Sequence, residues 1–151
     1  MKKVIVAIDG SETSKRVIDY ALHYAAREGD AKLIFVHVVS WTEGKRVSFM
    51  GQAVDILPPA EEVKEKFSVF VEDEIKATHS PRPDMTIRVE TGSPYAQIVA
   101  VAEETDADMI MIGHRGLGDL QRFFLGSVAA QVVAHAPCSV YVHRPRSGRP
   151  S

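Results

Sequence analysis

The sequence is short of the features that mark several classes of protein. It has one cysteine, Cys138, which excludes an intramolecular disulfide and a cysteine-rich zinc site. No apolar run approaches the roughly 18 to 20 residues that a transmembrane helix needs, and the apolar residues 4–8 are too few for a signal peptide. Basic charge is not in excess, since 18 Lys and Arg stand against 20 Asp and Glu. We therefore expect a cytoplasmic protein with neither a nucleic-acid surface nor a membrane-inserted segment.

The composition is that of one globular domain. Of 151 residues, 45% are hydrophobic and 25% are charged, which is typical of a soluble fold and not of a disordered chain. Residues 1–143 carry the apolar patterning and are predicted to form the domain. Residues 144–151 contain three arginines, two prolines and a glycine, and we expect them to be a disordered basic tail.

Short apolar runs rich in β-branched residues alternate with segments of helical periodicity. The predicted strands are residues 3–8, 33–39, 85–89, 107–112 and 139–143. The predicted helices contain residues 17–25, 63–75, 95–102 and 128–136, with Ser11 and Ser93 as N-caps and Gly29 as a stop. Residues 40–60 are polar and contain glycines and prolines, so we expect an irregular loop that covers a ligand, contacts a partner or is only a linker.

This alternation predicts an α/β fold, in which a single doubly wound domain has a five-stranded parallel sheet flanked by about four helices. Ligands of such sheets bind at the carboxyl ends of the strands, where the strand order reverses. If the first and fourth strands are neighbours at that point, the site consists of Asp9 and the loop that begins at Gly113.

The glycines after the fourth strand indicate a phosphate site. Gly113, Gly116 and Gly126 allow backbone N–H groups to approach an anion, and Ser127 adds a hydroxyl where the last helix begins. The segment is not a Walker A loop, and Gln121 stands where a dinucleotide fingerprint needs its third glycine. On these residues alone, a tight strand-to-helix turn explains the glycines equally well.

Several ordered segments resemble the universal stress protein family, over about residues 2 to 143. They are VIVAIDGSE (4–12), FVHVV (35–39), GSPYAQIV (92–99) and LGSVAAQVVAHAPCSVYV (125–142). Gly113, Gly116, Gly126 and Ser127 also fit the pattern G-x2-G-x9-G-[ST] of the family's ATP-binding branch without insertion or deletion. The resemblance implies a Rossmann-like sheet in the strand order 3-2-1-4-5, which agrees with the site inferred above.

The resemblance also implies roles for particular residues. Asp9 would contact the ribose or a Mg²⁺ or Mn²⁺ ion, and the backbone of Val38 would contact adenine. The ribose and phosphates of ATP, or of AMP or ADP, would be held by the glycines of the motif together with Ser127 and Val128. From its chemistry, Arg115 either pairs with phosphate oxygens or is a solvated loop residue.

The last predicted strand is expected at the edge of the sheet, where strands invite pairing with another chain. Relatives in the family pair this strand across a twofold axis, so Ser139, Val140, Tyr141 and Val142 are candidate contacts of a homodimer. The alternative is an edge covered by the basic tail. The resemblance also leaves room for a protein partner of unknown identity.

No catalytic group stands out. Ser127 lacks the nucleophile elbow G-x-S-x-G, and no general base is evident near it. His37 is expected to be a core histidine and Cys138 a buried, inert thiol, while His114 is either a phosphate-loop or a solvated residue. We therefore expect an ATP-binding stress-response regulator rather than an enzyme. The alternatives are a slow ATP hydrolase that uses Asp9, an AMP sensor and a nucleotide-free interaction module.

Overall fold

The computed structural model describes residues 1–40, 45–49, 52–56, 58–114 and 126–144. The strands within these residues are β1 (Lys2–Ala7), β2 (Ala31–Val39), β3 (Lys45–Phe49), β4 (Gln52–Ile56), β5 (Asp84–Thr91), β6 (Met109–Gly113) and β7 (Ser139–His143). The helices are α1 (Glu12–Glu28), α2 (Ala60–Thr78), α3 (Pro94–Thr105) and α4 (Ser127–His135). Over the same residues, no helix combines the length and apolar character needed to cross a membrane.

Five of the strands form one parallel sheet in the order β5-β2-β1-β6-β7. Numbered in chain order among themselves, these five strands read 3-2-1-4-5, so the predicted order is confirmed. The chain moves outward from β1 to β2 and β5, and then crosses back to β6 on the other side of β1. The order therefore reverses between β1 and β6, at the position predicted for the site.

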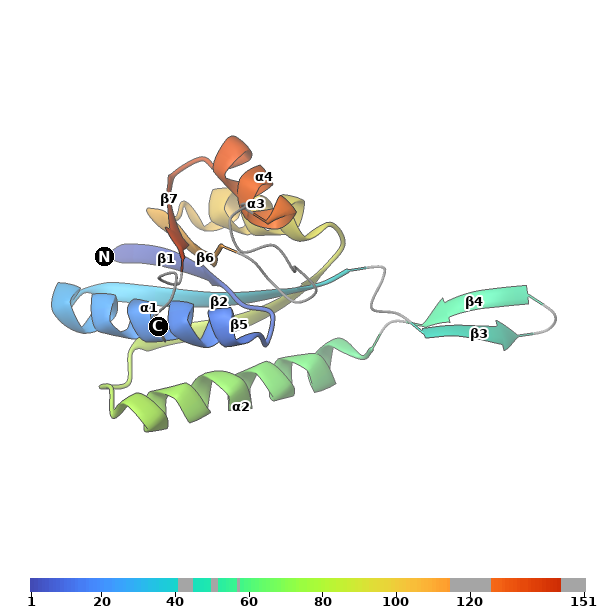
Figure 1. Ribbon diagram of the computed structural model, residues 1–151, viewed down its shortest axis with the longest axis horizontal. Helices are drawn as coiled ribbons and strands as arrows, with labels where there is room; N and C mark the ends of the chain where they lie inside the picture. The colour runs from blue at the N-terminus through green and yellow to red at the C-terminus, as the bar shows by residue number, and fades with distance from the viewer. Residues whose placement is uncertain (41–44, 50–51, 57, 115–125, 145–151) are drawn as a thin grey trace.

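Helices cover both faces of the sheet, with α1 and α2 on one face and α3 and α4 on the other (Figure 1). Residues of β1 alternate between the two layers: Val4 and Val6 pack with α1 and α2, whereas Ile5 and Ala7 pack with α3 and α4. All four are buried. This explains why β1 is apolar from Val4 onwards, because a strand between two helical layers has no solvent face.

The ends of α1 follow the capping rules. The Ser11 side chain accepts a hydrogen bond from Ser14 N, and Gly29 ends the helix at a φ of 77°, with its N–H bonded to Ala25 O. Glycine adopts a positive φ at the lowest steric cost because it has no Cβ, so the Gly29 stop has a steric reason. Both predicted ends of this helix are confirmed.

The prediction of an irregular loop over residues 40–60 is wrong for part of that segment. Strands β3 and β4 form an antiparallel hairpin, with Lys45 paired to Ile56 and Phe49 to Gln52. In sequence, Val47 and Phe49 alternate with more polar residues, which is the period of a strand. The glycines and prolines that suggested a loop lie outside the two strands. The hairpin lies apart from the five-stranded sheet (Figure 1).

Candidate functional site

A cavity of about 260 Å³ lies at the carboxyl ends of the central strands. Its walls come from the ends of β1, β2 and β6 and from the first turns of α3 and α4. Both helices thus begin at the cavity, and the N–H groups of a helix's first turn have no acceptor within the helix. The cavity therefore combines apolar strand ends with helix N-termini, which favour an anionic ligand.

Asp9 lies in the cavity wall directly after β1, and its side chain is fixed by the turn that begins α1. Asp9 Oδ1 accepts hydrogen bonds from Ser11 N at 3.0 Å and from Ser14 Oγ at 2.7 Å. Asp9 N donates to Ser14 Oγ at 2.8 Å. Gly10 has a φ of 83°, which lets the chain turn between the strand and the helix. Asp9 thus organises this turn and also lines the cavity.

On the opposite wall, backbone hydrogen bonds join the end of β6 to the start of α4. His114 N donates to His143 O at 2.7 Å, and Gly126 N donates to His114 O at 2.8 Å. Gly126 is the N-cap residue of α4 and makes no side-chain cap, so the helix start can closely approach a ligand. Gly113, Gly126 and Ser127 all line the cavity as a result.

The profile of the universal stress protein family matches residues 1–144. The chain belongs to this family. A relative from Staphylococcus saprophyticus assigned to the same family is 34% identical over 149 residues, which cover 95% of this chain and 83% of the relative.

Solved structures show the same fold. A universal stress protein crystallised in complex with cAMP has a TM-score of 0.67 and 27% identity, covering 95% of this chain and 96% of that one. A universal stress protein family protein from Arabidopsis thaliana with AMP bound has a TM-score of 0.63 and 23% identity, covering 100% of this chain and 97% of that one. The Rossmann-like fold of the family is thus established for this universal stress protein.

The structure brings most of the predicted site residues of this universal stress protein to one place. Six of them line the cavity: Asp9, Val38, Gly113, Gly126, Ser127 and Val128. Arg115 and Gly116 lie outside the described residues. The lining also includes Ser14, Ser40, Pro94 and Ile98, which the sequence did not assign to the site, and His114, for which a phosphate-loop role was one of two expectations. His114 is only 3% exposed, so the reading of a solvated loop residue is wrong.

Two of the unassigned residues come from α3. The connection from β5 to β6 has to pass over β2 and β1, which places the start of α3 above the cavity. The strand order implied by the resemblance contained this information, and it would have indicated Pro94 and Ile98. Ser14 had no such signal, because its contact with Asp9 depends on the fold of the turn.

His37 is buried, as predicted, and stands in the core between the cavity and α2. Its Nδ1 lies 2.9 Å from Ile8 O, and because a carbonyl only accepts, Nδ1 carries the proton. The ring stacks on Phe67 of α2, with centroids 4.0 Å apart and an angle of 21° between the planes. The histidine therefore joins the cavity wall to α2.

Strand β7 is an edge of the sheet and packs against α1. The ring of Tyr141 stacks on Tyr20 of α1, with centroids 4.1 Å apart and nearly parallel planes. Burial raises the pKa of Tyr141, while burial and the nearby Arg16 charge lower the pKa of His143. Just before β7, burial and the neighbouring Asp108 raise the pKa of the half-buried Cys138 thiol, so the unreactive thiol form is favoured.

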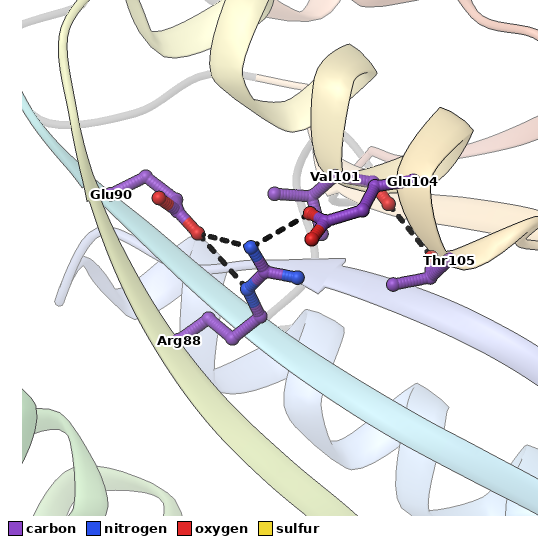
Figure 2. Close-up of polar contacts among 5 residues, drawn as sticks. All are labelled: Arg88, Glu90, Val101, Glu104 and Thr105. Atoms are coloured by element: carbon purple, nitrogen blue, oxygen red, sulfur yellow. Dashed lines mark hydrogen bonds and ion pairs between the residues drawn. The ribbon is translucent and has the colours of Figure 1, made fainter.

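A charged cluster ties α3 to the other edge strand, β5 (Figure 2). Arg88 Nε and Nη2 donate to Glu90 Oε1 at 2.9 and 2.7 Å, and Nη2 also donates to Glu104 Oε2 at 2.9 Å. Glu104 lies near the end of α3, whereas the first turn of that helix lines the cavity. The cluster therefore holds the helix at the end farther from the site.

Proposed function

We propose that this universal stress protein binds ATP with a divalent cation in the cavity between β1 and β6. The observation that carries the proposal is the meeting of Asp9, Gly113 and the start of α4 around one cavity at the point where strand order reverses. The cavity volume of about 260 Å³ is near the lower end of ordinary small-molecule sites. The family resemblance and a relative crystallised with cAMP support an adenine nucleotide.

In this proposal each wall of the cavity contacts a different part of the nucleotide. The backbone of Val38 contacts the adenine, and Asp9 contacts the ribose or the metal ion. Gly113, Gly126, Ser127 and Val128 hold the ribose and phosphates, because glycines allow close approach and the start of α4 attracts negative charge. In the same reading, Arg115 and Gly116 complete the phosphate loop.

The residues at the cavity fit a Mg²⁺ or Mn²⁺ ion held mainly by the nucleotide. The described residues contain no group of three or more His, Cys, Asp or Glu side chains that could hold a metal by itself. Mg²⁺ is commonly bound by one or two carboxylates together with phosphate oxygens and water. A single carboxylate at Asp9, facing a triphosphate, meets that requirement.

We further propose that nucleotide binding changes the conformation or assembly of a cytoplasmic homodimer, which a protein partner then recognises. Residues 139–142 of β7 supply the dimer contacts in this proposal, since β7 pairs only with β6 among the described strands. Light scattering is expected to give twice the chain mass of 16.6 kDa. A mass of 16.6 kDa at working concentration would contradict the dimer.

A calorimetric titration of nucleotide-stripped protein with ATP and Mg²⁺ tests the binding site. We expect micromolar affinity for the wild type and a loss of at least about tenfold for Gly126→Val, because a β-branched side chain would obstruct the approach of a phosphate. Ala134→Val is the control, since it also introduces a β-branched valine, at an exposed position of α4. It is expected to bind as the wild type does.

The outcomes separate the candidate functions. If the wild type gives neither heat nor a thermal shift with ATP, the ATP proposal fails and a nucleotide-free interaction module becomes the better account. Titration with AMP and with cAMP belongs in the same series, because a relative at 27% identity was crystallised with cAMP. ATP turnover that is lost in Asp9→Ala would favour a slow hydrolase.

A further inference from the structure

Ser14 makes an unusual pair of contacts with Asp9. Its hydroxyl oxygen accepts a hydrogen bond from Asp9 N at 2.8 Å and donates one to Asp9 Oδ1 at 2.7 Å. Ser14 is 5% exposed and lines the cavity beside Asp9. One buried hydroxyl on α1 therefore holds both the backbone and the carboxylate of Asp9, two residues after β1.

Two hydrogen bonds fix one oxygen of the Asp9 carboxylate. Oδ1 accepts from Ser14 Oγ and from Ser11 N, and these two donors use both lone pairs of the oxygen. The turn therefore holds the carboxylate in one orientation before a ligand binds.

We propose that Ser14 is a positioning residue of the nucleotide site, whose hydroxyl fixes the orientation of the Asp9 carboxylate for the ligand. This inference rests on the proposed function, because it concerns the same site. A carboxylate that is ordered before the ligand arrives loses less side-chain freedom on binding. Ser14 therefore raises the affinity of the site through Asp9 and not by touching the ligand.

A double-mutant cycle tests this role. Ser14→Ala is titrated with ATP and Mg²⁺ in the wild-type background and in the Asp9→Ala background. We expect the affinity to fall about fivefold in the first background and less than about twofold in the second, since the hydroxyl acts only through the carboxylate. The N-cap of α1 survives the substitution, because the backbone N–H of Ser14 makes the bond to Ser11 Oγ at 3.1 Å.

The control is Ser68→Ala. The Ser68 hydroxyl also bonds within a helix, to Lys64 O at 2.8 Å, but it lies on α2 away from the cavity. This variant is expected to keep the wild-type affinity. Full affinity in Ser14→Ala would overturn the proposal. So would an equal loss in both backgrounds, because Ser14 would then contact the ligand directly.

A second measurement separates this inference from the proposed function. If the wild type does not bind ATP, the proposed function fails, and amide hydrogen exchange still reports whether Ser14 holds Asp9. The Ser11 N–H donates to Asp9 Oδ1, so release of the carboxylate in Ser14→Ala should speed Ser11 exchange by about tenfold or more. Unchanged exchange at Ser11 would refute the positioning role.

Discussion

The two faces of the sheet differ in what covers them. One carries α1 and α2, of 17 and 19 residues, over a core that includes Phe35 and Phe67. The other carries α3 and α4, of 12 and 9 residues, over a core of aliphatic side chains and alanines. The first turns of α3 and α4 line the cavity, whereas α1 contributes only Ser14 among the described residues and α2 contributes none. Short helices with small residues thus leave the sheet open at the strand ends, and long helices close the other face.

Charge is placed differently on the two faces as well. On the closed face, Glu74 of α2 lies against Asp19 of α1, so two acidic side chains meet between helices. On the open face, Arg88 meets Glu90 and Glu104 in a cluster of opposite charges that is partly exposed to water. The closed face therefore contains a repulsive contact that depends on pH, and the open face contains an attractive one that depends on salt.

Among the substitutions that test this contrast between the two faces, the largest effect on stability is expected at Glu74. Burial, followed by the hydrogen bond and charge of Asp19, raises the pKa of Glu74 from 4.5 to about 7. The folded protein therefore favours the protonated carboxyl. The contribution of the Glu74 carboxyl to the stability of the fold is greatest below about pH 4.5. It declines as the pH rises towards 7 and is constant above that.

Glu74→Gln removes this dependence of stability on pH. At pH 8 we expect the variant to be more stable than the wild type by about 1 to 2 kcal/mol, after a reduction for partial solvent exposure. At pH 4.5 the difference is expected to be much smaller, because most of the wild-type carboxyl is already protonated in the fold. Urea unfolding at both pH values measures this difference in stability between the variant and the wild type. Glu65→Gln, at an exposed position of the same helix, is the control. Equal effects of Glu74→Gln at the two pH values would contradict the pairing.

The two faces also differ in how much of their structure could be predicted from the sequence. The strands of the main sheet and the ends of α1 were accessible, because apolar runs, an N-cap serine and a terminal glycine each have a local physical signature. The order of the strands came from the family resemblance. The hairpin was missed because glycines and prolines around it concealed two short alternating runs. Of the six candidate residues that line the cavity, Asp9, Gly113, Gly126 and Ser127 follow a strand or carry the glycine motif, and both features are visible in one dimension. Val38 and Val128 came only from the family resemblance.

Ser14 and the Asp19–Glu74 pair had no such signature. In sequence, Ser14 is a polar residue in the first turn of a helix, and such residues are common there. Its role arises only when the turn after β1 brings its hydroxyl to the Asp9 carboxylate. Asp19 and Glu74 are 55 positions apart and meet only because α1 and α2 pack side by side on one face. Contacts between distant elements depend on packing, which periodicity does not specify.

The smallest effect is expected on the open face, at Glu104. The side chains of Arg88 and Glu104 are 31% and 64% exposed, so water and salt screen their attraction. Glu104→Gln should cost only about 0.5 kcal/mol at low salt, and less at 1 M salt. Glu103→Gln, at an exposed neighbouring position of α3, is the control. Because the cluster holds the end of α3 farther from the cavity, ATP affinity should stay within about twofold of the wild type in both variants. A loss of more than about 2 kcal/mol would mean that the open face relies on this cluster as the closed face relies on its core, and the contrast between the two faces would fail.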